Sequence, residues 1–286
     1  MPPSNTAQSA SGPDWLAFAR RSATGVAAML EAHPLTADRA PTTGRGEGGD
    51  NALVIDRGAE DVVFAELEAL GVGLTAISEE RGHVDVRGGG ETHVVIDPID
   101  GSLNAKRRLA PYCLSIAVAS GPRMGDVHLA FVHDLAGGEE WWATLGAGAT
   151  VGGAAIPPLD PSGPLEVLGV ESASPERIAS HSGALAATGA AKLRVVGSMT
   201  LAMCFVADSR LDAMASLAPC RSVDVAASQL IVRAAGGVVA FPDHPAGPDP
   251  EGVPLDLSMR SRVLAANGEA VLDGLLAELG HVDRAR

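Results

Sequence analysis

The sequence predicts an α/β protein with an α+β N-terminal half and a layered α/β C-terminal half. Two stretches with helical periodicity come first, and a run of short strands with tight Gly and Asp turns follows them. After four prolines between residues 157 and 164, strands and helices alternate, as is typical of layered α/β structure. We expect two domains, 14–155 and 165–286, behind a disordered lead-in over 1–13, which is rich in Pro, Ser and Gly.

The N-terminal half is predicted to begin with two helices. Over 15–31 and again over 56–70, apolar residues recur at helical spacing on one face. Residues 34–50 lose this periodicity and end in the run Gly-Arg-Gly-Glu-Gly-Gly-Asp. Because no Gly-Lys-Ser/Thr follows, this run is not a phosphate-binding P-loop, and we interpret it as a flexible loop. The alternative is a mobile lid whose Glu47 or Asp50 assists a weak extra metal site.

The rest of this half is predicted to be strands. Apolar and β-branched runs separated by turn residues cover 74–77, 92–96, 112–119, 127–133 and 140–144. The tight turns between the later runs favour an antiparallel meander, which the two helices would flank.

The C-terminal half is predicted to alternate between strands and helices. The expected strands cover 165–170, 193–196, 211–214, 238–241 and 263–266. The expected helices cover 175–187, 199–207, 225–235 and 269–279. This pattern predicts a second, helix-covered layer of strands.

The composition excludes several classes of partner. The chain carries 21 Lys and Arg against 35 Asp and Glu, a formal charge of −14. Nucleic-acid binding and polybasic membrane anchoring both need clustered basic residues, so we expect neither partner. The 3 cysteines are widely spaced in apolar contexts, and we expect buried thiols rather than disulfides. With no signal peptide and no apolar run near ~20 residues, the protein is expected to be soluble and cytoplasmic.

The clearest chemical signal is the run Val-Val-Ile-Asp-Pro-Ile-Asp-Gly-Ser, where a predicted strand ends. Pro98 blocks continuation of the strand, and Gly101 permits a sharp turn. Such a turn can bring the carboxylates of Asp97 and Asp100 to one side, with the carbonyl of Ile99 between them. Oxygen ligands in this arrangement suit Mg²⁺, whereas two uncompensated carboxylates raise each other's pKa. We therefore predict a magnesium site at this turn.

Other acidic residues share this placement but carry a weaker signal. Glu79 and Glu80 end a strand, and taken alone they fit a solvated turn. Asp224 and Asp56 stand at the start of predicted helices, and taken alone each fits a helix N-cap, with Glu60 one turn after Asp56.

The backbone after the turn predicts an anion site. The N–H groups of Gly101, Ser102 and Leu103 open a short helical turn, where they can bind an anion without any lysine. The Ser102 hydroxyl can orient an attacking water, with an acidic side chain accepting the proton. An anion site beside bound cations suits phosphoryl transfer, because metals bridge phosphate oxygens and activate water.

Two segments resemble the signatures of the inositol monophosphatase superfamily. Residues 94–104, Val-Val-Ile-Asp-Pro-Ile-Asp-Gly-Ser-Leu-Asn, are similar to the first signature. Residues 223–237, Val-Asp-Val-Ala-Ala-Ser-Gln-Leu-Ile-Val-Arg-Ala-Ala-Gly-Gly, are similar to the second. The lesser pieces Val-Ile-Asp, Ile-Ser-Glu-Glu and Gly-Ser come in the family's order, so the resemblance spans about residues 14 to 280. Ser102 and the Gly-Val-Gly-Leu-Thr-Ala-Ile-Ser-Glu-Glu run are most similar to the archaeal-type branch, which includes enzymes acting on inositol monophosphate and fructose 1,6-bisphosphate.

The resemblance implies an α-β-α-β-α layered fold and a Mg²⁺-dependent phosphomonoesterase with two or three ions per site, in a family that commonly forms homodimers. The metal ligands that it implies are Glu79, Asp97, the Ile99 carbonyl, Asp100 and Asp224. The catalytic residues that it implies, which position or deprotonate the nucleophilic water, are Asp56, Ser102 and Glu79. The substrate's phosphate is assigned to Gly101 and Ser102, and its alcohol side to Gly197 and Ser198.

The chain also departs from the family pattern. Four positions differ from the aromatic residues or the glutamate that the signatures usually carry there: Val94, Ala105, Val223 and Ala234. More importantly, residues 213–223 contain no carboxylate, whereas inositol-specific members use an acid there to grip a substrate hydroxyl. The only charged side chain of this stretch is Arg221, which we predict to bind a second phosphate or another anionic group of the substrate. A surface arginine is the alternative.

These patterns predict hydrolysis of a small sugar or polyol phosphate monoester, inositol monophosphate or fructose 1,6-bisphosphate or both, by metal-activated water. One alternative is a nucleotide 3′-phosphatase of the same superfamily, which the scarcity of aromatic residues (3 Trp, 1 Tyr, 5 Phe) for base stacking disfavours. The other is a non-catalytic ligand-binding member of the fold, which the cost of retaining unpaired buried acids disfavours.

Overall fold

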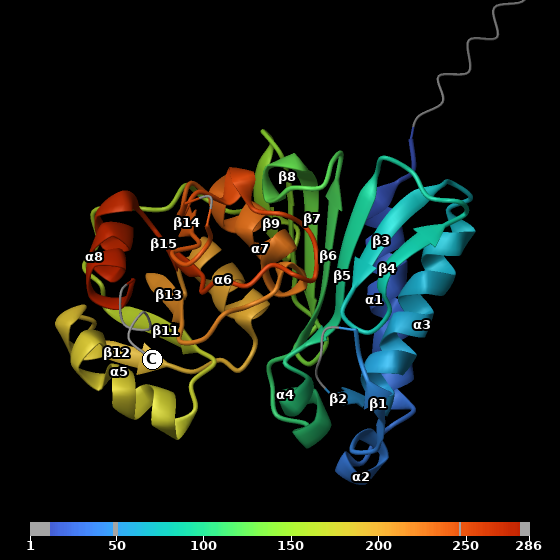
Figure 1. The fold of residues 1–286 in the computed structure, drawn as a ribbon, viewed down its shortest axis with the longest axis horizontal. Helices are drawn as coiled ribbons and strands as arrows, with labels where there is room; N and C mark the ends of the chain where they lie inside the picture. The colour runs from blue at the N-terminus through green and yellow to red at the C-terminus, as the bar shows by residue number, and fades with distance from the viewer. Residues whose placement is uncertain (1–11, 48–50, 246, 281–286) are drawn as a thin grey trace, which may run out of the picture.

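Five layers, α-β-α-β-α, stack across the molecule in the computed structural model, which describes residues 12–47, 51–245 and 247–280 (Figure 1). Most of the lead-in predicted over 1–13 lies outside the described residues, as does Asp50. The predicted fold class is confirmed. The division into domains 14–155 and 165–286 stays a prediction.

The first two layers come from the N-terminal half. Helices α1 (Trp15–Glu31) and α3 (Val54–Ala69) lie side by side on one face of an eight-stranded sheet, on the right in Figure 1. The strand order is β10-β9-β8-β7-β6-β5-β3-β4. The strands are β3 (Leu74–Ser78), β4 (Gly82–Val86), β5 (His93–Asp100), β6 (Cys113–Ala119), β7 (Val127–Asp134), β8 (Glu140–Thr144), β9 (Gly148–Val151) and β10 (Ala154–Ala155). From β5 to β10 consecutive strands pair antiparallel, so the predicted meander is confirmed, while β3 and β5 pair parallel.

The other three layers belong to the C-terminal half. Helices α6 (Met199–Ala207) and α7 (Ser222–Ala234) lie between the two sheets (Figure 1). The second sheet has five strands in the order β12-β11-β13-β15-β14, and α5 (Pro175–Ala187) and α8 (Glu269–Leu279) cover its outer face. These strands are β11 (Val167–Glu171), β12 (Lys192–Arg194), β13 (Ala213–Ser216), β14 (Val238–Ala240) and β15 (Leu264–Ala266).

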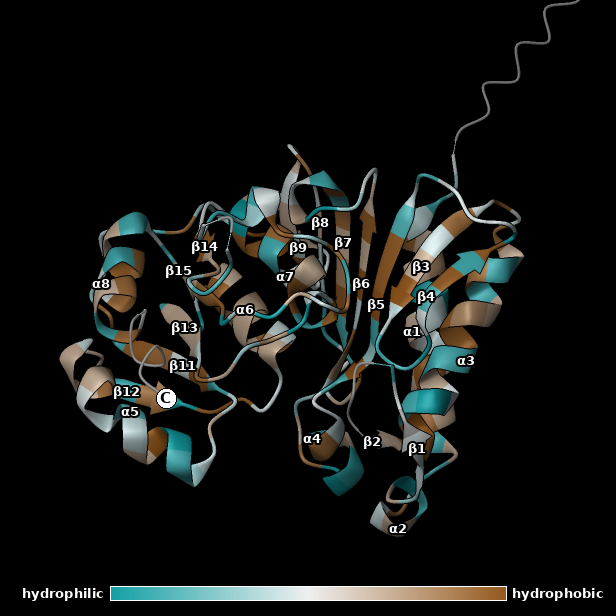
Figure 2. Ribbon diagram, in the orientation of Figure 1, coloured by the Kyte–Doolittle hydropathy of each residue, from teal (hydrophilic) through white to brown (hydrophobic). Residues whose placement is uncertain are grey.

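Three apolar clusters fill the spaces between the layers. One lies between α1, α3 and the large sheet, one surrounds α6 and α7, and one lies beneath α5 and α8. Because α6 stands between two sheets, it is apolar around most of its circumference, and seven of its nine residues are buried. Figure 2 shows the corresponding distribution of hydropathy, with hydrophobic strands at the centre and hydrophilic patches on the outer helices.

The prediction for residues 34–50 is partly wrong. This segment contains a short helix, α2 (Thr36–Arg39), and the strand β1 (Thr42–Arg45), which pairs antiparallel with β2 (Asn51–Leu53). The segment shows no apolar period because β1 and β2 form a separate two-stranded sheet at the edge of the molecule.

Two findings bear on the compositional predictions. Cys113, Cys204 and Cys220 are buried and unbridged, as predicted. Among the described residues, no helix is long and apolar enough to cross a membrane.

Candidate active site

A pocket of about 510 Å³ lies where the end of β5 meets the first turns of α3, α7 and α4 (Ser102–Arg107). The structure places in its wall every residue predicted as a metal ligand or a catalytic group, together with Gly101 and Arg221. These residues are Asp56, Glu79, Asp97, Ile99, Asp100, Gly101, Ser102, Arg221 and Asp224. Gly197 and Ser198 do not line the pocket and lie behind it, against Gly101 and Asp100.

The turn after β5 differs from its prediction in one respect. The strand does not stop before Asp97 but continues through Asp100, with one extra residue between them relative to β6. Pro98 is tolerated because this bulge interrupts the ladder where a donor N–H would be required. The bulge turns Asp97 back on the chain, so that its Oδ1 accepts the N–H of Ile99 at 3.1 Å.

Gly101 and Ser102 complete the turn. Gly101 has φ +90°, and a Cβ at this position would lie 3.0 Å from the carbonyl oxygen of Gly197, so both backbone conformation and space favour glycine. Ser102 then begins α4, and its hydroxyl donates to the carbonyl of Ile99 at 2.8 Å. The predicted helical turn after Gly101 is therefore present.

Asp56 and Asp224 are not N-caps, because both helices begin earlier than predicted. Each is the third residue of its helix and accepts the N–H of the residue before the helix. Asp56 accepts from Leu53 at 3.0 Å, and Asp224 accepts from Arg221 at 2.7 Å. An acid in the first turn is also favoured by the helix dipole.

Asp56 keeps one oxygen without a partner. Because the Ser102 hydroxyl gives its proton to the carbonyl of Ile99, Oδ1 of Asp56 is buried with no hydrogen bond from the described part of the chain. Burial raises the pKa of Asp56 to about 6, although the hydrogen bond from the Leu53 N–H opposes the rise. A carboxylate oxygen that is buried without a hydrogen bond can accept a proton.

Asp100 is fixed by the start of α6. Its Oδ2 accepts from the Ser198 hydroxyl at 2.7 Å and from the N–H of Thr200 at 2.6 Å. Ser198 is also the N-cap of α6 and accepts the N–H of Leu201 at 3.2 Å. Burial raises the pKa of Asp100 to about 6, with these donors opposing it.

Arg221 lies inside the carboxylate cluster, which makes the surface-arginine alternative wrong. Its Nη2 contacts Oε1 of Glu79 at 2.7 Å and Oδ1 of Asp224 at 3.0 Å, and its side chain is 14% exposed. Burial nevertheless raises the pKa of Glu79 to about 8, because desolvation outweighs the attraction of Arg221. Burial, together with the charges of Glu79 and Asp100, raises the pKa of Asp97 well above its ordinary value.

The cluster fits a hard divalent cation by its donor chemistry. Carboxylate and carbonyl oxygens share one pocket, and Oδ1 of Asp56 and Oε2 of Glu80 are buried there without hydrogen-bond partners among the described residues. As the side chains stand, however, no three His, Cys, Asp or Glu of the described ranges surround a common metal position. Asp100 faces α6, while Glu79 and Asp224 hold Arg221. Metal binding therefore requires Glu79 and Asp224 to exchange Arg221 for the cation.

Three residues that support the site carried no prediction of that role. Glu60 is fully buried in α3 and its Oε1 accepts the N–H groups of Glu80 and Arg81, so the 79–81 turn is not merely solvated. Glu171, at the end of β11, accepts two N–H groups of the segment before α6. Thr200 donates its N–H to Asp100. For Glu171 a signal existed, since it is an acid at a strand end like Asp97.

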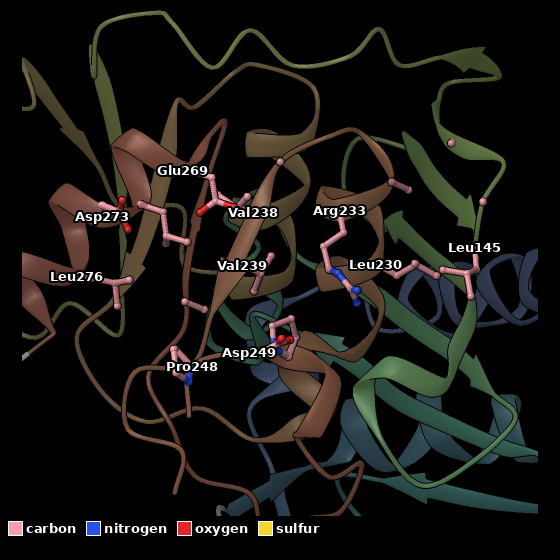
Figure 3. A pocket seen from close by; sticks show the side chains of 17 residues that line it. Leu145, Leu230, Arg233, Val238, Val239, Pro248, Asp249, Glu269, Asp273 and Leu276 are labelled. Atoms are coloured by element: carbon pink, nitrogen blue, oxygen red, sulfur yellow. The ribbon is translucent and has the colours of Figure 1, made fainter. Parts of the chain in front are cut away.

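A larger cavity of about 830 Å³ lies among α7, β14 and α8, and contains none of the predicted site residues (Figure 3). Leu230, Val239 and Leu276 form part of its wall, and the Arg233 guanidinium in it is engaged by Gln229 and Glu251. Size alone therefore does not identify the site, and the acidic pocket remains the candidate.

Comparisons with known proteins identify the family of the chain. The model of the inositol monophosphatase family matches residues 14–283. The chain is 32% identical over 265 residues to the fructose-1,6-bisphosphatase/inositol-1-monophosphatase of Methanothermobacter thermautotrophicus, covering 88% of this chain and 91% of that protein. It is 30% identical over 227 residues to the Nus factor SuhB of Vibrio cholerae, covering 77% and 81%. The crystal structure of an inositol monophosphatase-fructose 1,6 bisphosphatase superposes with a TM-score of 0.79 at 24% identity, over 93% of this chain and 100% of that one.

Proposed function

Because the chain belongs to the inositol monophosphatase family, we propose that it hydrolyses a small sugar or polyol phosphate monoester with Mg²⁺. The observation that carries this proposal is the convergence of buried and half-buried carboxylates from β5, α3, α7 and the 79–80 turn on one pocket. Relatives named fructose-1,6-bisphosphatase/inositol-1-monophosphatase support this substrate class. The substrates proposed are inositol monophosphate and fructose 1,6-bisphosphate.

Two or three Mg²⁺ ions are proposed to bind in the pocket. The residues that would hold them are Glu79, Asp97, the Ile99 carbonyl, Asp100 and Asp224. When bound, the cations stabilise charge on the phosphoryl oxygens and lower the pKa of a bound water. The pocket's excess of carboxylates over Arg221 leaves a net negative charge that favours this binding.

The chain's own residues supply the proton acceptor and the anion site. Oδ1 of Asp56, buried and without a partner among the described residues, is proposed to take the proton of the attacking water. Ser102, anchored on the carbonyl of Ile99, keeps hydroxyl lone pairs that can accept a hydrogen bond from that water. The N–H groups of Gly101 and Ser102 are proposed to bind the phosphate, and Gly197 and Ser198 to border the alcohol side.

Arg221 is proposed to select the substrate. A Mg²⁺ ion that takes Glu79 and Asp224 removes these two carboxylates from the guanidinium. A second anionic group on the substrate then offers Arg221 a charge-assisted bond, which a singly phosphorylated polyol lacks. This favours fructose 1,6-bisphosphate over inositol monophosphate.

The test is phosphate release from a panel of inositol 1-phosphate, fructose 1,6-bisphosphate and adenosine 3′,5′-bisphosphate, with Mg²⁺ or with excess EDTA. Asp97→Asn is expected to lower kcat/KM by several orders of magnitude, because removing one central metal ligand weakens every metal-dependent interaction. Asp85→Asn, an exposed acid on β4, is the matched control and keeps full activity. Turnover that persists in EDTA, or in Asp97→Asn, contradicts the metal mechanism.

Relatives named Nus factor SuhB make a non-catalytic role the second candidate. If the wild-type protein binds Mg²⁺ by calorimetry but releases no phosphate from any panel substrate, that candidate replaces the first. Preference for adenosine 3′,5′-bisphosphate would instead identify a nucleotide 3′-phosphatase.

A further inference from the structure

Glu171 is a buried carboxylate that holds a short segment of backbone. It ends β11 in the smaller sheet and is 3% exposed. Its Oε1 accepts the N–H of Val196 at 2.8 Å and its Oε2 accepts the N–H of Gly197 at 3.0 Å. No Lys or Arg side chain within the described ranges is paired with it. The carboxylate thus accepts hydrogen bonds from two backbone N–H groups and does not pair with a cationic side chain of the described residues.

The N-terminal half holds the same segment from the other side. Asn104 of α4 donates from Nδ2 to the carbonyl of Val196 at 3.1 Å and to that of Pro111 at 2.9 Å. Gly197 has φ +81°, and a Cβ there would lie 2.7 Å from Nδ2 of Asn104. Segment 196–198 is therefore clamped between the two halves, with Glu171 fixing its N–H side.

The clamped segment leads directly to a proposed metal ligand. It ends at Ser198, whose hydroxyl donates to Oδ2 of Asp100, and two residues later the N–H of Thr200 donates to the same oxygen. Segment 196–198 therefore carries one donor to Asp100, the Ser198 hydroxyl, and leads into the helix start that carries the other, the Thr200 N–H. Burial raises the pKa of Glu171 to about 7, although its two hydrogen bonds from backbone N–H groups oppose the rise. Burying a carboxyl group at this position therefore costs free energy.

We propose that Glu171 is a positioning residue that sets the orientation of Asp100 through segment 196–198, and with it the alcohol side of the substrate site. The inference rests on the proposed function, in which Asp100 binds Mg²⁺ and Gly197 and Ser198 border the substrate. Outer partners that orient metal ligands are typically worth about 10- to 100-fold in metal affinity or activity.

The test variant is Glu171→Gln, which keeps the shape but replaces one acceptor oxygen by a donor NH₂, so one N–H loses its partner. We expect kcat/KM to fall and the Mg²⁺ dissociation constant, measured by calorimetry, to rise, each by about tenfold or more. Glu166→Gln, an exposed glutamate on the same segment of chain, is the matched control and leaves both unchanged.

A double-mutant cycle with Ser198→Ala separates positioning from mere stability. If Glu171 acts through Ser198, the losses from the two single variants do not add in the double variant. Additive losses overturn the proposal, and so does a Glu171→Gln protein with a lowered melting temperature but wild-type kcat/KM and Mg²⁺ affinity. If Glu171→Gln does not fold, Glu171→Asp, which keeps the carboxylate on a shorter stem, is measured in its place.

If the proposed function is wrong, the experiments give a different set of results. A wild-type protein that releases no phosphate from the panel refutes the phosphatase proposal, while the comparison of Mg²⁺ affinities still decides the role of Glu171. A wild-type protein that binds no Mg²⁺ overturns both.

Discussion

Asp56 and Asp224 accept the same kind of backbone hydrogen bond at the starts of two helices. Each stands three residues into its helix, bonds backward to the preceding N–H, and brings its carboxylate to the pocket. The sequence correctly predicted both acids at helix starts. It did not show whether each acid is the N-cap or the third residue of its helix, because the same kind of apolar run follows in either case. The backbone hydrogen bond distinguishes the two cases, because each of these carboxylates accepts the N–H of the residue three positions before it.

Asp56 provides a test of proton transfer that is separate from metal binding. Because its Oδ1 has no hydrogen-bond partner in the described part of the chain, Asp56→Asn is expected to lower kcat by about 10²- to 10⁴-fold. The Mg²⁺ dissociation constant should change by less than about tenfold, since Asp56 is not one of the proposed ligands. Steady-state kinetics and calorimetry check the two values, with the exposed Glu68→Gln on the same helix as the control. A variant that loses Mg²⁺ binding and rate in parallel would show that Asp56 is a ligand instead.

Arg221 provides a test of competition between a guanidinium and the cation. Arg221→Gln removes a positive charge from Glu79 and Asp224, so Mg²⁺ should bind more tightly, by about tenfold if the lost repulsion is about 1.4 kcal/mol. The same change should reduce the kcat/KM ratio of fructose 1,6-bisphosphate to inositol 1-phosphate. Arg123→Gln, at an exposed arginine, controls for net charge. Unchanged Mg²⁺ affinity in Arg221→Gln would contradict the competition.

At the scale of elements, the longer helices were predictable and several short strands of the N-terminal half were not. Four helices occupy their predicted ranges, because each has an apolar face and a polar or Gly boundary: α1, α5, α6 and α8. The strands that carried no prediction are short, polar or rich in Gly and lie at or next to a sheet edge: β1, β2, β4, β9 and β10. Their hydrogen bonds come from a neighbouring strand, so their own residues need little β pattern.

The turn between β5 and α4 is the element on which the site depends most. Gly101 and Gly71 both have positive φ, +90° and +75°, but only Gly101 lacks room for a Cβ. Gly71→Ala should therefore cost only the backbone strain, about 1–2 kcal/mol, and keep full activity. Gly101→Ala should cost more, because its Cβ would also press on the Gly197 carbonyl and on Tyr112, and it should lose most of its kcat/KM. Urea unfolding and kinetics test the pair, and equal stability losses would contradict the close approach at Gly101.

For the whole molecule, the site exists only where the two halves meet. The sequence identified the acids one by one, from their positions at strand ends and helix starts and from a family resemblance. It did not reveal that Arg221 pairs with Glu79, or that Glu171 and Asn104 clamp one segment from opposite sides. These contacts join residues far apart in the chain, so only the packing of the layers brings them together.

From that convergence we predict that stability depends on pH and on Mg²⁺. Burial raises the pKa of Asp56 and Asp100 to about 6, of Glu80 and Glu171 to about 7, and of Glu79 to about 8. A carboxyl group with a raised pKa holds its proton more tightly in the folded than in the unfolded chain. It therefore contributes stability that is complete below its unfolded pKa, near 4, and is lost as pH rises through the folded value.

In EDTA, the contribution of these five groups to the free energy of unfolding should thus fall between pH 5 and pH 8. We therefore expect the measured free energy of unfolding to be lower at pH 8 than at pH 5. Mg²⁺ should offset part of the loss, most strongly at pH 8, because it binds the deprotonated carboxylates of the proposed ligands Glu79 and Asp100 and its binding releases their protons. Urea unfolding at pH 5 and pH 8, in EDTA, in MgCl₂ and in KCl of equal ionic strength, measures both effects. The KCl series separates specific binding from screening, since only MgCl₂ should restore stability at pH 8. A free energy of unfolding that rises from pH 5 to pH 8 in EDTA, or equal stabilisation by Mg²⁺ at both pH values, would mean that the buried acids do not act as one cation-binding cluster.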